Sequence, residues 1–121
     1  MNTHMDALET RDPAAREAAL LAALPGQIAH AQKNAPAFAE ILKNIHAADI
    51  TSRAALAKLP VIRKYELLEK QKASRAAGGS VFGGFSAVYY GSQMPRVFSS
   101  PGPLYEPEGS RADYWLSLIH I

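Results

Sequence analysis

Cysteine is absent from the 121-residue chain, which excludes disulfide bonds, catalytic thiolates and cysteine-ligated zinc. The four histidines are not spaced like metal ligands, either from one another or from a pair of carboxylates, so no metal site is predicted. Thirteen basic and eleven acidic residues give a net charge of +2 without a strong basic cluster. Arg63-Lys64 is interpreted as part of a solvated helix face. We therefore expect neither nucleic acid nor a membrane as partner.

Long apolar runs are missing as well. No window of the sequence approaches the length of a membrane span. Residues 1–12 are polar and of mixed charge, unlike a signal peptide, and are expected to form a disordered leader. The chain is therefore expected to be cytoplasmic. Hydrophobic residues make up 48%, which is ordinary for a globular protein, although much of this fraction is alanine and adds little area to a core.

Residues 13–75 are predicted to form a helical N-terminal segment. Asp12-Pro13 is a typical helix start, because it offers a capping carboxylate and a proline at the first helical position. Pro25-Gly26 predicts a kink or a break, after which helix resumes to about Lys33. Three further helices are expected after Asn34-Ala35-Pro36, from Ser52 through Lys58, and from Arg63 to Lys72.

The character of the chain changes at Ala76, where glycine becomes frequent. Val88-Tyr89-Tyr90 and Arg96–Ser100 are the two strand candidates, and Pro101-Gly102-Pro103 predicts a turn after the second. Ser110, with Asp113 three residues later, resembles a capping box that would start another helix. The predicted fold class is therefore α/β and incomplete, with residues 76–115 forming the first strands of a truncated domain.

Ser99, Ser100 and Gly102 are the candidate binding residues. A strand, a loop with serine and glycine, and a following helix can hold a phosphate, because loop amides and a helix N-terminus present converging donors. The loop lacks a lysine, however, and three prolines remove N–H donors from it. Glu106 and Glu108 would repel a triphosphate. On local chemistry alone an ordinary turn is the favoured interpretation.

The order of several segments resembles the N-terminal part of a phenylacetate–CoA ligase-like protein of the AMP-forming (adenylate-forming) acyl-CoA synthetase superfamily. Ile28–Ala31 followed by Asn34–Phe38 is similar to the family's "HA…SPxY" stretch. Asp49–Leu56 leading into Leu59–Lys64 and Leu67-Leu68 is similar to its "LxxLPxxxKxdL" segment. Phe82–Phe85 precedes Arg96–Ser100, which resembles the strand that enters the family's "SSGTTGKPT" loop. The similarity runs from about Leu20 to Trp115.

The resemblance implies the activity of the full-length relatives. These activate a small-molecule carboxylate with ATP and magnesium to an acyl-adenylate, and then form a thioester with coenzyme A. Phe98, Ser99, Ser100 and Gly102 carry over as loop positions, whereas Pro101 to Pro107 replace the family's Thr, Thr, Gly and Lys. The carboxylate pocket, the ribose-binding aspartate and the catalytic lysine are implied to lie beyond residue 121. The chain alone is therefore expected to be inactive, and no catalytic residue is nominated.

Two other classes remain as alternatives. One is a catalytically divergent homologue with a remodelled phosphate loop. The other is a free-standing helical interaction module, with a core or partner groove made of Leu20, Leu24, Ile28, Phe38, Ile41 and Leu42. No feature of the sequence specifies an oligomeric state.

Residues 116–121 (LSLIHI) are expected to be a non-native tail. A helix begun at Ser110 and continued through them would be apolar on almost every face, which fits no amphipathic pattern. A buried helix that packs on the rest of its domain is the alternative interpretation.

Overall fold

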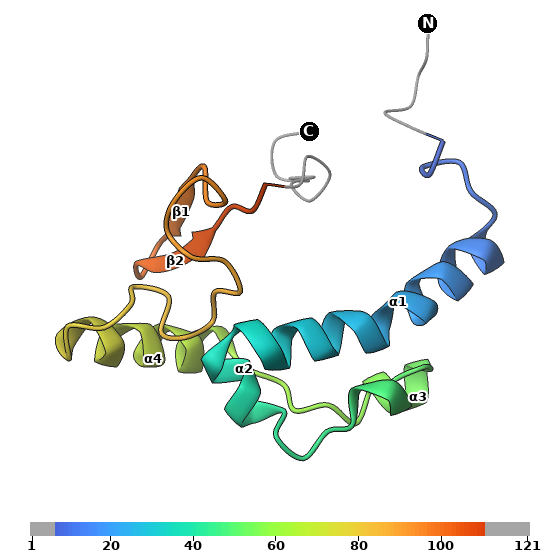
Figure 1. The fold of residues 1–121 in the computed structure, drawn as a ribbon, viewed down its shortest axis with the longest axis horizontal. Helices are drawn as coiled ribbons and strands as arrows, with labels where there is room; N and C mark the ends of the chain where they lie inside the picture. Colours follow the sequence, from blue (N-terminus) through green and yellow to red (C-terminus); the bar gives the residue numbers. More distant parts are fainter. Residues whose placement is uncertain (1–6, 111–121) are drawn as a thin grey trace, which may run out of the picture.

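A computed structural model describes residues 7–110 of the chain, so the sequence predictions that fall on residues 1–6 and 111–121, the helix after Ser110 and the tail among them, lie outside the described residues. The described part is a small mixed domain of helices and a two-stranded antiparallel sheet (Figure 1). The elements are α1 (Pro13–Asn34), α2 (Pro36–Ile41), the 3₁₀ helix η1 (Ala47–Asp49), α3 (Arg53–Leu56), α4 (Lys64–Ala76), β1 (Val97–Ser100) and β2 (Leu104–Pro107). Among residues 7–110, no helix combines the length and the apolar character needed to cross a membrane.

The first helix begins where its capping signal predicts. The Asp12 carboxylate accepts hydrogen bonds from the backbone N–H groups of Ala14 at 2.9 Å and Ala15 at 3.1 Å. Of the kink or break predicted at Pro25-Gly26, the break is wrong, because α1 continues through Pro25 to Asn34. The proline removes a single hydrogen bond from a long helix whose flanking turns are rich in alanine and leucine, so helix persists on both sides.

A glutamine side chain holds α1 against the end of α2. The Gln32 amide donates to the backbone carbonyls of Leu42 at 2.9 Å and Ile45 at 2.8 Å. Both carbonyls lie after the last residue of α2, and Leu42 O also accepts a hydrogen bond from Ile45 N at 2.9 Å. Leu42 is buried at this junction. The helix predicted after Asn34-Ala35-Pro36 is α2, which ends at Ile41, and the chain turns there.

The two strands form a hairpin around Pro101-Gly102-Pro103, so the predicted strand and turn are confirmed there. Arg96 O accepts a hydrogen bond from Glu108 N at 2.9 Å. Hydrogen-bonded and non-hydrogen-bonded pairs alternate along an antiparallel ladder. Because Arg96 and Glu108 form a hydrogen-bonded pair, the next pair, Val97 and Pro107, is a non-hydrogen-bonded one. The missing N–H of Pro107 therefore removes no hydrogen bond between the two strands.

The strand predicted at Val88-Tyr89-Tyr90 is wrong, because this segment is a loop. The Ser86 hydroxyl donates to Val88 O at 2.5 Å and accepts from Val88 N at 3.2 Å. A hydroxyl that occupies both backbone groups of a residue two positions later competes with strand pairing.

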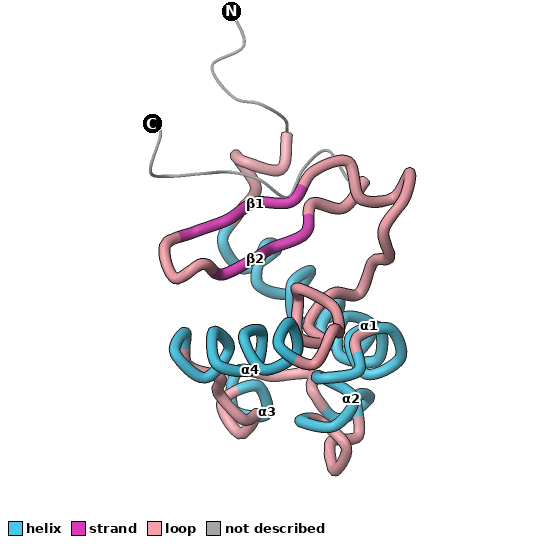
Figure 2. Tube along the Cα trace, turned by 90° about the vertical axis from the view of Figure 1, so that its left-hand side faces the viewer, coloured by secondary structure: helices cyan, strands magenta, loops and turns pink. Residues whose placement is uncertain are grey.

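A second glutamine attaches the hairpin to α4. Gln71 is only 1% exposed, and its amide donates to Tyr105 O at 2.8 Å and accepts from Tyr105 N at 2.9 Å. The side chain thus pairs with β2 as a neighbouring strand would. Figure 2 shows the hairpin lying over α4, the helix that carries this residue. Phe82, 2% exposed, and Gln71 are the two largest fully buried side chains among residues 7–110.

Replacing Gln71 by alanine is expected to destabilise the protein. The backbone N–H and C=O of Tyr105 would lose their partners at a partly buried site, and an unsatisfied buried group costs about 1–3 kcal/mol. Urea unfolding measures the loss, and amide exchange locates it, since the Tyr105 amide should exchange faster. Gln27→Ala, on the exposed face of α1, is the control and should change neither quantity. Equal effects of the two variants would contradict this role of Gln71.

Candidate functional site

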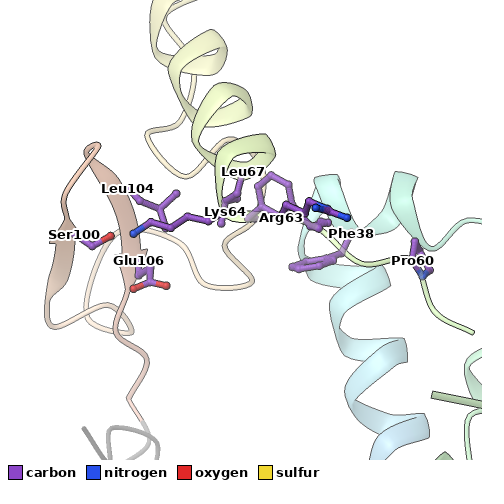
Figure 3. A pocket seen from close by; sticks show the side chains of 10 residues that line it. Phe38, Pro60, Arg63, Lys64, Leu67, Ser100, Leu104 and Glu106 are labelled. Atoms are coloured by element: carbon purple, nitrogen blue, oxygen red, sulfur yellow. The ribbon is translucent and has the colours of Figure 1, made fainter. Parts of the chain in front are cut away.

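An open groove of about 590 Å³ lies between the hairpin, the start of α4 with the loop before it, and a side formed by Phe38 of α2 and Phe85 (Figure 3). Ten residues line it: Phe38, Pro60, Ile62, Arg63, Lys64, Leu67, Phe85, Ser100, Leu104 and Glu106. Six of these side chains are apolar, three are charged and one carries a hydroxyl. Volumes of this size are typical of small-molecule sites, and a mostly apolar lining with a few polar groups is their usual chemistry.

The aromatic side of the groove is built by a close approach of two segments. The rings of Phe38 and Phe85 meet edge to face, with centroids 5.3 Å apart and planes at 89°. The Ala37 N–H donates to the carbonyl of Gly84 at 3.0 Å. Gly84 has a φ of +83°, and a Cβ on it would lie 3.2 Å from the backbone nitrogen of Ala37. Glycine at this position therefore allows the contact that places Phe85.

Two cations stand at the N-terminus of α4. The Glu66 carboxylate accepts a hydrogen bond from the backbone N–H of Arg63 at 2.7 Å, which fixes this first turn. Figure 3 shows Lys64 extending towards the hairpin, where Ser100 and Glu106 lie, whereas Arg63 extends towards Phe38. Within residues 7–110, neither cation forms an ion pair. Both are therefore available to an anion that enters the groove.

The structure separates the three residues that the sequence nominates. Ser100, at the end of β1, lines the groove and is half-buried. Ser99 is exposed, and as its neighbour on a strand it projects to the opposite face. Gly102 lies in the turn, where a Cβ would come within 3.1 Å of Leu68 Cδ1. In the described part of the chain β2 follows this turn, so residues 101–107 do not form a loop that leads into a helix.

The sequence nominates neither Lys64 nor Phe85 as a site residue, and it places Phe38 only in the core or partner groove of the alternative helical module. Arg63-Lys64 carries the pattern of a solvated helix face, and nothing in its spacing signals a groove. Phe38 and Phe85 are far apart in the chain and meet only through the contact between Ala37 and Gly84. The resemblance is the one sequence signal whose segments include Phe38, Phe85 and the pair Arg63-Lys64.

Glu108 does not add negative charge to the groove, because Arg96 engages it. The Arg96 Nη2 donates to Glu108 Oε1 at 2.6 Å, and Nε donates to the other carboxylate oxygen. The hydrogen bonds from Arg96 hold the pKa of the Glu108 carboxyl below its ordinary range. The expected repulsion from this residue is therefore offset by its own partner.

In the described range, no group of three or more histidine, aspartate or glutamate residues could hold a metal ion. Comparison of the chain with protein-family models, with curated proteins and with solved structures gave no match in any of the three. The candidate site is therefore defined by its geometry and by the residues that line it.

The pairing of Glu108 predicts how stability depends on pH. A pKa lowered by folding means that the folded protein takes up the proton less readily than the unfolded chain. The pair's contribution is thus complete above the pKa of the unfolded carboxyl, about 4.3, and is lost as pH falls through the lower folded pKa.

We expect E108Q to be less stable than the parent chain at pH 7, and the difference to shrink as the pH falls below about 4.3. Unfolding by urea at a series of pH values measures this. The control is E69Q, which removes an exposed carboxylate that binds Lys72 at 2.9 Å and should change stability little. A difference for E108Q that stays constant down to low pH would contradict the prediction.

Proposed function

We propose that the chain is the N-terminal part of an ATP-dependent acyl- or aryl-CoA ligase of the phenylacetate–CoA ligase-like kind. The complete protein would activate a carboxylate as its acyl-adenylate and then transfer the acyl group to coenzyme A. It would act in the cytoplasm with ATP, coenzyme A and magnesium. Residues of this chain would contribute one wall of the site, with Ser100 as the nominated loop position that reaches it.

One observation supports this proposal above the others: the segments that carry the resemblance meet at a single groove. Phe38 ends the first of these segments, and Phe85 ends the glycine loop. Pro60 through Leu67 come from the second segment, and Ser100 closes the strand that resembles the entry to the phosphate loop. If the segments that resemble the family serve one function, folding is expected to bring their binding residues together at one site.

The remodelled loop favours one variant of this proposal, in which the protein is a catalytically divergent homologue. With Pro101-Gly102-Pro103 as a hairpin turn, the loop offers few N–H donors to a triphosphate. A homologue that keeps the fold but binds nucleotide differently would share the groove. The catalytic groups assigned by the resemblance to residues beyond 121 would then decide whether adenylation occurs.

The proposal predicts carboxylate-dependent exchange of pyrophosphate into ATP by the complete gene product, read from the genomic locus through its stop codon. The 121-residue chain alone should show none, because positioning and electrostatic stabilisation by the remaining residues are required. Exchange is measured with labelled pyrophosphate over a panel of aryl and alkyl carboxylates. A locus without adenylation motifs downstream, or exchange by the 121-residue chain itself, would contradict the proposal.

A helical interaction module is the second candidate, and the exposure of α1 favours it. This helix of 22 residues contains no buried residue, and Leu20 on it is 60% exposed. Of the six residues expected to form the module's core or groove, Leu42 is buried and Phe38 lines the groove. The half-exposed stripe of Leu21, Leu24 and Ile28 is available to a partner.

Thermal unfolding of the isolated chain separates the two candidates. A self-sufficient module should melt cooperatively, and its binding of a dye for exposed apolar surface should be limited to the exposed side of α1. The ligase proposal predicts a non-cooperative melt with strong dye binding or aggregation. Leu20→Gln is the informative variant: it should reduce dye binding if α1 is the exposed surface, and leave it unchanged if another face is responsible.

A further inference from the structure

We propose that a small aromatic pocket in the loop between α4 and β1 is a docking site for a proline-rich segment of a partner protein. This tyrosine pocket is lined by Pro36, Ser80, Phe82, Gly84, Ser86, Val88, Tyr89 and Tyr90. It shares no lining residue with the groove described above, so the inference does not depend on the ligase proposal.

The size of the tyrosine pocket limits what can enter it. Its volume of about 210 Å³ lies below the range of about 300–1,000 Å³ that is typical of small-molecule sites. One side chain of a longer ligand therefore suits the pocket better than a whole cofactor or substrate does. An extended peptide, which presents its side chains to a surface one at a time, meets this requirement.

The pocket presents aromatic side chains on a loop of fixed shape. The Ser86 hydroxyl engages both backbone groups of Val88, and the Tyr90 ring lies against the buried ring of Phe82 with centroids 5.7 Å apart. Tyr89 and Tyr90 are nevertheless 77% and 64% exposed. A ligand that packs on them meets rings whose backbone is already ordered, which lowers the entropic cost of binding.

The polar side chains of the pocket are all hydroxyls, and they have protons to donate. Among residues 7–110, the hydroxyls of Tyr89 and Tyr90 have no hydrogen-bond partner. The Ser80 hydroxyl accepts from the backbone N–H of Phe82 at 3.2 Å and keeps its own proton for a ligand. No charged side chain lines the pocket. The lining therefore suits a neutral ligand that is rich in acceptors and poor in donors.

A proline-rich segment has this chemistry. In the polyproline II conformation its backbone carbonyls make no internal hydrogen bonds, and its prolines have no N–H to satisfy. Such segments dock in grooves lined by aromatic side chains. One proline ring would enter the pocket between Pro36 and the two tyrosines, and neighbouring carbonyls would accept from the free hydroxyls.

A cation is the other ligand that aromatic rings attract. No carboxylate lines the pocket, so the charge of a bound cation would stay uncompensated. The rings of Phe82 and Tyr90 also lie against each other, with planes inclined by 33°, rather than around a common point. Both observations favour the proline ligand.

Titration of the 121-residue chain with an end-blocked oligoproline peptide, followed by NMR, tests the inference. We expect the amide signals of residues 80–90 to shift. Tyr89→Ala should weaken binding about tenfold, and Tyr89→Phe, which keeps the ring and removes the hydroxyl, should weaken it about threefold. The matched control is Tyr65→Ala, because Tyr65 is 63% exposed on α4 and does not line the pocket, and it should change affinity less than about twofold.

The uncharged lining makes a second prediction for the same titration. Raising the salt concentration from about 50 to about 500 mM should change the affinity less than about twofold, because no ion pair is available to be screened. A loss of binding with salt would contradict the inference, since it would show that charged groups elsewhere on the chain hold the peptide.

Four further results would overturn the inference. The first is the absence of shifts in residues 80–90 at millimolar oligoproline, and the second is equal binding of a glycine–serine peptide of the same length. The third is an equal loss for Tyr89→Ala and Tyr65→Ala. The fourth is tighter binding of tetramethylammonium than of oligoproline, which would show a cation site. The amide spectrum of each variant verifies its fold. None of these titrations contains ATP, so a failure of the ligase proposal in the exchange assay is distinguishable from a failure here.

Discussion

The pairing of the Gln71 amide with the backbone of Tyr105 is the interaction on which the arrangement depends. A two-stranded hairpin alone is marginally stable in water. Here one buried side chain on α4 pairs with both backbone groups that Tyr105 of β2 turns away from β1. This pairing attaches the hairpin to α4, and hence places Ser100 in the same groove as Lys64. Gly83 permits it, since a Cβ there would lie 3.1 Å from the Gln71 backbone.

The groove follows from three polar contacts that are not themselves part of it. Gln71 holds the hairpin, the Ala37–Gly84 hydrogen bond places the aromatic pair, and Glu66 fixes the turn that presents Lys64. The first two contacts join a backbone group of one segment to another segment, and the third lies within the first turn of α4. The lining side chains are therefore positioned by the backbone, while their own ends stay available for a ligand. Such an arrangement suits binding, because the site exists before the ligand arrives.

Local signals in the sequence predicted the features that local chemistry decides. The Asp12 cap, the turn at Pro101–Pro103 and the strand before it involve neighbours in the chain. The two errors have local causes that compete with the signal: the helix persists through Pro25, and the Ser86 hydroxyl occupies both backbone groups of Val88. Local signals could not predict the groove, because it depends on contacts between distant parts of the chain. Gln71 has the sequence context of a surface residue, and its partner Tyr105 lies 34 positions away.

The outer edge of β2 has a further consequence for how this sheet can be enlarged. That edge is occupied by Gln71 at Tyr105, and Pro107 has no N–H to offer at its end. Lateral growth is therefore directional. An additional strand, from this polypeptide or from another, can join only alongside β1, where the backbone groups of Val97 and Ser99 point away from β2. The sheet can thus be extended by a strand that pairs with β1, and it cannot be extended at β2.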